Sequence, residues 1–258
     1  MIKQSPRQNL VDGDAVVKEA LSRLEHPSRR RFLQHSLTLG GLSLITGCTI
    51  TDDKSAESAL MKISRFNDKV QAWLFDPNRL APTYPESMIT RPFPFNAYYD
   101  EDEVPEVDAN SFRLEVTGLV ADRHAWSLPE LRALPQADQV TRHICVEGWS
   151  AIGKWGGVPF PVFLRRVGAD LNAKYVGFKC ADDYYTSIDM PTALHPQTLL
   201  TLSYDGQPLP PRYGFPMKLR MPTKLGYKNP KHIQAIFVTN TYPGGYWEDQ
   251  GYNWFGGS

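Results

Sequence analysis

Short apolar runs alternate with polar turn segments and short helical segments between residues 112 and 242. β-branched and apolar residues dominate these runs, and turn-forming residues interrupt them. That pattern is typical of strands bounded by turns. We expect strands at 112–120, 139–146, 173–181, 184–190 and 232–242.

Helical periodicity is confined to short segments. Ser127 stands before an apolar repeat with Glu three positions later, which is typical of a helix N-cap. We expect short helices at 66–75, 127–135 and 158–168, the last entered through proline, and a mixture of helix, turn and strand in 191–222. The fold class predicted is α+β and strand-dominated.

Composition narrows the class of protein. The chain has 258 residues, enough to bury a full core, and its 21 prolines and 12% aromatic content favour a loop-rich fold over a helical bundle. Its formal net charge is zero and no basic patch stands out, so we expect no nucleic-acid partner. None of its three cysteines lies in a CxxC motif, so there is no motif for a zinc ribbon, a thioredoxin-type dithiol or covalent haem.

The N-terminal region resembles an export signal. The sequence SRRRFLQ at 28–34 precedes a Gly-rich apolar stretch that is too short to span a membrane. Arg29 and Arg30 match the twin-arginine signal, with Gln34 where lysine is usual. We therefore expect residues 1–48 to direct export of the folded protein to the periplasm or cell envelope. Such export often carries a protein with its cofactor installed.

Two further features follow the export signal. The sequence ITGC, ending at Cys48, resembles a lipobox, which leaves lipid attachment at Cys48 and plain cleavage nearby as alternatives. Residues 49–89 are predicted to form a tether and N-terminal extension, and 90–258 the main domain. The Pro-rich, acidic segment 76–108 is too aromatic for disorder, so we expect it to lie ordered on the body.

Cys145 raises the main chemical question. It falls near the end of the predicted strand 139–146, just before the sequence EGW, where a rigid element meets a loop. Such a position suits a reactive group, but also an inert buried thiol or a disulfide with Cys180. In a regular strand His143 would share the face of Cys145, and Arg142 would point away.

The order of motifs resembles a known family. RHICVEGWSAIGKWGGVPF is followed by KYVGFKCADDYYTSIDM and then by DGQPLPPRYGFPMKLRMPTKLGYKNPKHI. Over roughly residues 90–240 this succession resembles the molybdopterin-binding domain of the sulfite oxidase family, particularly its periplasmic protein-methionine-sulfoxide reductase branch. The resemblance implies a sulfite oxidase-type fold and a molybdenum–molybdopterin cofactor. The chain has no room for the family's C-terminal immunoglobulin-like dimerisation domain, so we expect a monomer.

The resemblance also implies roles for individual residues. Cys145 corresponds to the family's single protein ligand to molybdenum, and a soft thiolate suits that metal. The implied cofactor-binding residues are Asn96, Tyr99, Asp100, Cys180, Tyr213, Lys218, Lys228, Asn229, Pro230 and Lys231. Three of them depart from the reductase branch, which has threonine, asparagine and arginine at the positions of Cys180, Tyr213 and Lys218. Solvated lysines and a packed surface arm are the alternatives, and His143 is either close to the metal or purely structural.

The implied reaction is oxygen-atom transfer, and we expect it to be reduction of a small-molecule or protein sulfoxide. The chain has no electron-carrying motif of its own, so a separate haem-containing membrane redox subunit is expected. Sulfite oxidation is the alternative within the family, and it needs convergent cations, for which Arg142, Arg212 and Arg220 are candidates. The aromatic residues Trp149, Trp155, Tyr184 and Tyr185 either favour a neutral substrate or belong to the core. In a different class, the chain is a non-catalytic envelope lipoprotein with a structural disulfide.

Overall fold

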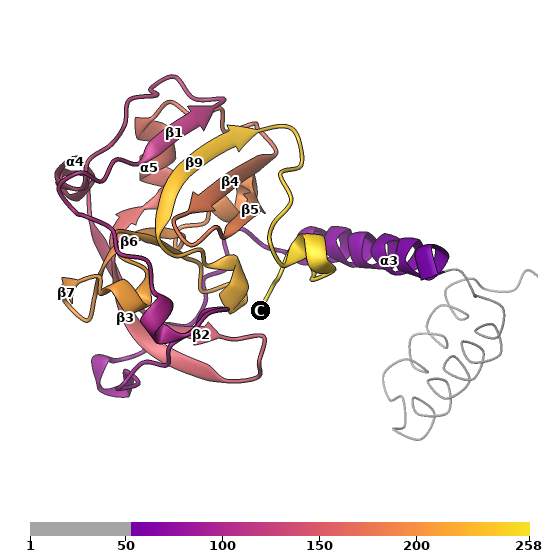
Figure 1. The fold of residues 1–258 in the computed structure, drawn as a ribbon, viewed down its shortest axis with the longest axis horizontal. Helices are drawn as coiled ribbons and strands as arrows, with labels where there is room; N and C mark the ends of the chain where they lie inside the picture. The colour runs from indigo at the N-terminus through magenta and orange to yellow at the C-terminus, as the bar shows by residue number, and fades with distance from the viewer. Residues whose placement is uncertain (1–52) are drawn as a thin grey trace, which may run out of the picture. The chain divides into compact units, whose positions relative to one another are not determined.

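Two β-sheets enclose the main core of the protein in the computed structural model, which describes the backbone from residue 53 and the side chains from residue 62 to residue 258 (Figure 1). One sheet has the strand order β1-β9-β4-β5, and the other the order β2-β3-β6-β7, with β8 paired to β6. The strands are β1 (Glu115–Gly118), β2 (Ala137–Ile144), β3 (Ser150–Pro159), β4 (Tyr175–Cys180), β5 (Tyr185–Asp189), β6 (Leu199–Tyr204), β7 (Gln207–Pro208), β8 (Lys218–Arg220) and β9 (Ile233–Thr239).

The described α-helices are short, except for one of 22 residues. The α-helices described are α3 (Asp53–Leu74), α4 (Leu128–Ala133), α5 (Phe160–Arg166) and α6 (Met190–Ala193). Single turns of 3-10 helix cover Glu86–Met88, Glu101–Glu103, Pro211–Tyr213, Gly226–Lys228 and Glu248–Gln250. Among residues 53–258, no helix is long and apolar enough to cross a bilayer.

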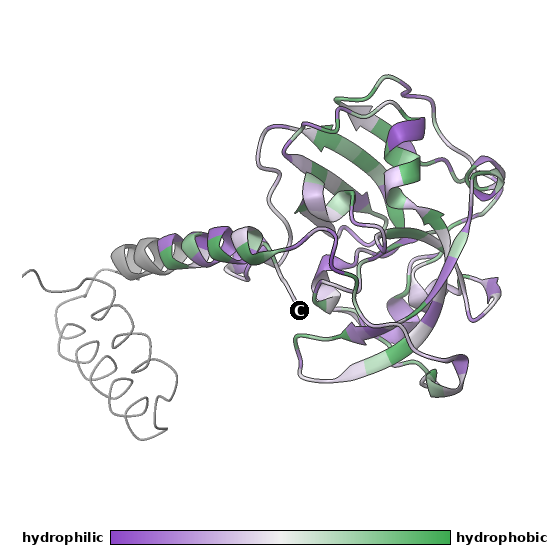
Figure 2. Cartoon of the chain, turned by 180° about the vertical axis from the view of Figure 1, so that it is seen from behind, coloured by the Kyte–Doolittle hydropathy of each residue, from purple (hydrophilic) through white to green (hydrophobic). Residues whose placement is uncertain are grey.

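Both sheets contribute to one apolar core. Val176 and Ile236 from the first sheet join Val158 and Leu200 from the second, and Phe163 of α5 packs into the same cluster. The strands of the first sheet are largely hydrophobic (Figure 2), as expected where a sheet is covered. Burial of these core residues therefore sets the register of the strands.

The five predicted strands and the capped helix are confirmed. Ser127 accepts a hydrogen bond from the Glu130 backbone N–H, and the Glu130 side chain accepts one from the Ser127 N–H. This capping box fixes the start of α4. The helix predicted at 66–75 is longer than expected, because α3 begins at Asp53. Residues 53–65 are rich in Ala, Lys, Glu and other good helix formers.

The long strand β3 was not predicted. Its glycines at 153, 156 and 157 interrupt the alternation and favour a loop by composition. In the structure β3 pairs with both β2 and β6, with a register shift at Gly156/Gly157. A Cβ at Gly157 would lie 2.1 Å from the Leu200 carbonyl oxygen. The glycine therefore permits a close approach of two backbones, which the apolar pattern does not reveal.

The segment 76–108 lies ordered on the body, as predicted. The Tyr84 N–H donates to the Val140 carbonyl (3.0 Å), and the Thr90 N–H donates to the Ile152 carbonyl (2.9 Å). Phe93 is buried in an aromatic cluster with Trp155. These contacts attach the segment to β2 and β3 and bring its later residues towards Cys145.

Candidate functional site

Cys145 follows β2 directly and begins a turn. Its N–H donates to the Trp149 carbonyl, and its own carbonyl accepts from the Gly148 N–H. Gly148 has a φ of +94°, a conformation that favours glycine. His143 is buried and Arg142 is exposed, which confirms the predicted alternation along the strand. The turn therefore places the thiol on the inner face, where β2 ends.

Cys145 opens into a cavity built from five separated parts of the chain. They are the segment around Asn96, the turn after β2, the loop after β4, the loop after β8, and the C-terminal region. The lining residues are Asn96, Ala97, Tyr98, Tyr99, Cys145, Val146, Glu147, Asp182, Tyr184, Gly226, Tyr227, Asn229, Pro230, Lys231, Trp247 and Tyr252. Six of the residues predicted as ligand or cofactor contacts are brought together here, namely Asn96, Tyr99, Cys145, Asn229, Pro230 and Lys231.

Two polar side chains contact the thiol. The Asn96 Nδ2 atom lies 3.2 Å from Cys145 Sγ and donates to it. The thiol in turn lies 3.6 Å from Glu147 Oε2, which also accepts a hydrogen bond from the Trp149 indole at 2.9 Å. Burial and the Glu147 carboxylate raise the pKa of Cys145. A cation bound at the sulfur would reverse that effect by stabilising the thiolate.

Asp182 is a cavity residue that sequence reasoning missed. The Tyr99 hydroxyl donates to Asp182 Oδ2 at 3.1 Å, and the Tyr98 hydroxyl donates to the Asp182 carbonyl. Burial raises the pKa of Asp182. These bonds attach the segment around Asn96 to the loop after β4. A polar residue directly after a strand, in the sequence CADDYY, was the available signal.

A buried cation cluster lies beside the cavity and comprises Lys218, Arg220 and Lys231. Lys231 lines the cavity, and its Nζ has no hydrogen-bond partner among the described residues. Burial lowers the pKa of Lys231 to about 8. Burial and the charges of Lys231 and Arg220 lower the pKa of Lys218.

The cation cluster fits an anionic ligand. Arg220 is fully buried and donates only to neutral oxygens, those of the Asn229 amide and the Arg142 carbonyl. All three positive charges, together with burial, lower the pKa of the buried His143. Buried charges are normally paired, so an excess of positive charge here calls for an anion. The phosphate of the molybdopterin that the resemblance implies would satisfy that requirement.

Lys228 does not serve as predicted. Its ammonium is buried and forms an ion pair with Glu248, and it also donates to the Ser187 carbonyl at 2.7 Å and the Thr186 hydroxyl at 3.2 Å. All three of its donors are therefore used within the protein, and none is left for a phosphate. The structure therefore places the Lys228 ammonium against the C-terminal segment, which supplies its counter-charge, and not on the cavity wall.

Asn229 lines the cavity, and its side chain mainly stabilises the surrounding loop. Its amide oxygen accepts from Arg220 Nη1 at 3.2 Å and from the Met221 N–H at 2.7 Å, and its amide nitrogen donates to the Leu225 carbonyl. Pro230 beside it accepts a backbone hydrogen bond from Leu219. Asn229 thus fixes the loop that carries Lys231.

Three other predicted contacts lie off the cavity wall. Tyr213 is buried in the aromatic cluster, and its hydroxyl donates to the Phe93 carbonyl at 2.9 Å. Asp100 is exposed and precedes a 3-10 turn. Cys180 is buried in the main apolar core. Because their polar atoms face the protein interior or solvent, the structure does not support direct cofactor contact by these side chains.

No disulfide joins the two described cysteines. Cys145 and Cys180 are both buried and both free. The alternative of a lipoprotein stabilised by a Cys145–Cys180 disulfide is therefore wrong. Of the four aromatic residues that were expected to favour a neutral substrate, only Tyr184 lines the cavity, whereas Trp155 is fully buried in the core.

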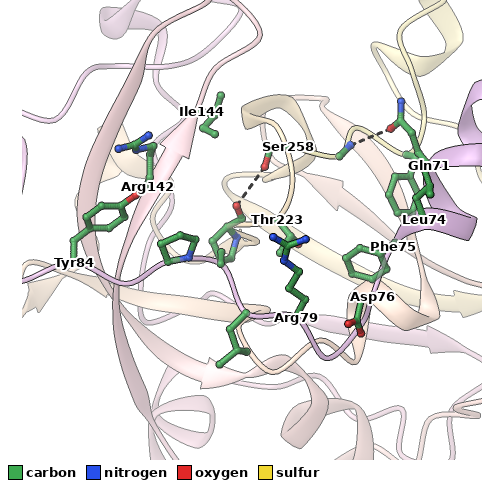
Figure 3. A pocket seen from close by; sticks show the side chains of 16 residues that line it. Gln71, Leu74, Phe75, Asp76, Arg79, Tyr84, Arg142, Ile144, Thr223 and Ser258 are labelled. Atoms are coloured by element: carbon green, nitrogen blue, oxygen red, sulfur yellow. Dashed lines mark hydrogen bonds between the residues drawn. The ribbon is translucent and has the colours of Figure 1, made fainter. Parts of the chain in front are cut away.

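A second cavity lies on the other side of β2, beside Arg142 and Ile144 (Figure 3). The Arg142 guanidinium lies over the Tyr84 ring at 5.3 Å, away from the face that carries Cys145. Thr223 and the C-terminal Ser258 form another part of its wall. None of the predicted cofactor contacts lines this cavity, so the cavity at Cys145 is the candidate site.

Comparisons with known proteins show the family of this chain. A family model described as the oxidoreductase molybdopterin binding domain matches residues 101–247, more than half of the chain. The putative protein-methionine-sulfoxide reductase subunit YedZ1 of Azospira oryzae is 77% identical to this chain, and the match covers 100% of both. The protein-methionine-sulfoxide reductase catalytic subunit MsrP of Xanthomonas campestris is 34% identical over 53% of this chain and 47% of that protein.

A solved structure supports the fold. The sulfane dehydrogenase SoxCD from Paracoccus pantotrophus matches with a TM-score of 0.50 and 18% sequence identity, over 54% of this chain and 40% of that one. The resemblance, strand-dominated fold and cofactor class predicted from the sequence are confirmed. The chain belongs to the oxidoreductase molybdopterin binding domain family and is a molybdenum-dependent oxidoreductase.

Proposed function

We propose that this protein reduces sulfoxides to thioethers, with methionine sulfoxide in proteins as the main substrate. The observation that carries the proposal is the 77% identity, over the full length, to a putative protein-methionine-sulfoxide reductase subunit. In the reaction the S–O bond breaks, and two electrons and two protons convert the oxygen to water. A separate redox subunit supplies the electrons, in keeping with the word subunit in that relative's name.

The charges around the cavity favour a neutral substrate over sulfite. Of the described Lys and Arg residues, only Lys231 lies on the cavity wall. Of the three candidate cations, Arg142 faces away, Arg212 forms an ion pair with Glu101 at 3.2 Å, and Arg220 is fully buried behind the cavity wall, where it donates to the Asn229 amide and the Arg142 carbonyl. A sulfite dianion needs several cations beside the reacting centre. A neutral sulfoxide needs only a hydrogen-bond donor and an apolar wall, so the cavity suits it better.

Individual residues then have definite tasks. Bound molybdenum–pterin would supply the two-electron redox change that oxygen-atom transfer requires. Cys145 would hold the metal through its thiolate, and Asn96 would orient the sulfur by donating to it at 3.2 Å. Lys231, backed by Lys218, would hold the anionic end of the pterin. The exposed Glu147 carboxyl, 3.6 Å from Sγ, is placed to carry protons in from solvent.

A substrate panel tests this function. The purified, molybdenum-loaded protein is expected to reduce methionine sulfoxide and dimethyl sulfoxide with a reduced viologen dye, and to leave sulfite unoxidised. Membranes containing the haem-bearing partner are expected to replace the dye, with haem oxidation visible by absorption only when both protein and sulfoxide are present. Sulfite oxidation without sulfoxide reduction would exclude the proposal in favour of the sulfite dehydrogenase alternative.

We also propose that the protein is exported by the twin-arginine route to the periplasm or cell envelope. The motif residues lie outside the residues that the structure describes, so the support is the sequence SRRRFLQ at 28–34. Changing Arg29 and Arg30 to lysine is expected to leave the precursor in the cytoplasm on cell fractionation. Normal delivery of that variant would exclude the route, and absence of fatty-acid label would exclude lipid attachment at Cys48.

A further inference from the structure

The C-terminal segment 245–252 forms one wall of the cavity that holds Cys145. Trp247 and Tyr252 of this segment line the cavity, together with Tyr98 from the segment before β1. The Trp247 and Tyr252 ring centroids are 5.1 Å apart, and Tyr98 stacks on Tyr246 at 4.8 Å with an angle of 23° between the rings. We call Tyr98, Trp247 and Tyr252 the aromatic wall.

The aromatic wall reaches the mouth of the cavity. Tyr98 is 38% exposed and Tyr252 is 40% exposed, whereas Cys145 and Lys231 on the inner part of the cavity are buried. Val146, also on the lining, is 49% exposed. A side chain entering from solvent therefore passes apolar and aromatic surfaces before it reaches the thiol.

A buried ion pair holds the wall in place. Glu248, next to Trp247, pairs with Lys228 and accepts from the Thr186 hydroxyl at 2.6 Å. The Tyr246 N–H donates to the Tyr185 carbonyl at 2.8 Å. Lys228 immediately precedes the Asn229–Lys231 part of the cavity lining. The wall is thus attached to β5 and to the loop that carries Lys231, which makes it a preorganised surface.

We propose that the aromatic wall recognises the S-methyl and methylene groups of a methionine sulfoxide side chain, and so determines specificity for that substrate. The inference rests on the proposed function and deepens it. The S-methyl and methylene groups beside the oxidised sulfur remain apolar and pack favourably against aromatic rings. Contact of this end with the wall leaves the sulfoxide oxygen directed inward, towards Cys145 and Asn96. Dimethyl sulfoxide, with less apolar surface, would gain less from the wall.

Single substitutions in the wall test the proposal. Trp247→Leu and Tyr252→Leu are expected to raise KM for methionine sulfoxide about 5- to 10-fold and to leave kcat per bound molybdenum within about twofold. The KM for dimethyl sulfoxide is expected to change less. Tyr242→Leu is the matched control, because Tyr242 is 45% exposed, packs on Tyr175 and Trp254, and does not line the cavity.

A binding measurement separates recognition from turnover. Calorimetry with N-acetyl-methionine sulfone methylamide, an unreactive analogue, is expected to show weaker binding by the two wall variants and unchanged binding by the control. Tyr98→Leu provides a third variant if Trp247→Leu does not fold. Unchanged KM and unchanged sulfone binding in correctly folded wall variants would overturn the inference alone. A wild-type protein that neither reduces sulfoxides nor binds the sulfone would overturn the proposed function as well.

Discussion

Replacing Cys145 with serine is expected to lower the rate of sulfoxide reduction at least ~100-fold, because mutation of a residue that only supports a metal ligand can already cost that much. Cys145 Sγ lines the cavity and accepts a hydrogen bond from Asn96. Serine has nearly the same volume, but its hydroxyl is a hard and weakly acidic ligand in place of a soft thiolate. Turnover with a reduced viologen dye, measured beside molybdenum content, checks this result.

Cys180→Ser is the matched control for the cysteine ligand. Cys180 is buried in the main core and does not line the cavity, so this variant should keep its molybdenum and a substantial part of its activity. Molybdenum content reports cofactor retention separately from turnover, because the cation cluster remains to hold the pterin in either variant. Normal turnover by the Cys145 variant with loss in the Cys180 variant would mean that the ligand has been misassigned.

Replacing Lys228 with methionine is expected to lower the free energy of unfolding by about 3–5 kcal/mol. Lys228 and Glu248 are both buried, and the change leaves the Glu248 carboxylate in the interior without its counter-charge. The Thr186 hydroxyl is then the main remaining donor to that carboxylate. Because Glu248 adjoins Trp247, we also expect a higher KM for methionine sulfoxide. Urea denaturation and steady-state kinetics measure the two effects.

Two further variants test whether burial of the unpaired Glu248 carboxylate causes the loss of stability. The double variant Lys228→Met/Glu248→Leu should recover most of the lost stability, because no isolated charge remains buried. Lys154→Met breaks the ion pair with Glu86, whose side chain is 64% exposed, and should cost less than about 1 kcal/mol. Equal losses for Lys228→Met and Lys154→Met would contradict the explanation.

Local patterns predicted most of the fold. Short runs dominated by apolar and β-branched residues identified β1, β2, β4, β5 and β9, because these strands are largely buried against the core. Ser127 and Glu130 marked the start of α4, because capping depends on neighbouring residues only. The strand β3 was not predicted, because its glycines argued against a strand. Gly157 is needed there because the Leu200 backbone, from a distant part of the chain, leaves no room for a Cβ.

The site was predicted in part. Cys145, Asn96 and Lys231 meet at one cavity, as the resemblance implied. Lys228 matched the family motif and Tyr213 fell at a motif position with a different residue, yet Glu248 engages Lys228 and the Phe93 carbonyl engages Tyr213. Whether a polar side chain is available to a ligand depends on partners far away in sequence, so motif position alone does not decide it.

The sequence by itself determined the family, the cofactor class and the cysteine to examine, because motif order, strand alternation and a thiol at a strand end are local features. Only the tertiary structure decided which cations remain unpaired, and that the C-terminal segment closes the cavity. Trp247 lies about a hundred residues from Cys145 in the chain, and a buried ion pair together with the backbone contact to β5 holds it there. Such contacts follow from packing and desolvation across the whole fold, which no short stretch of residues records.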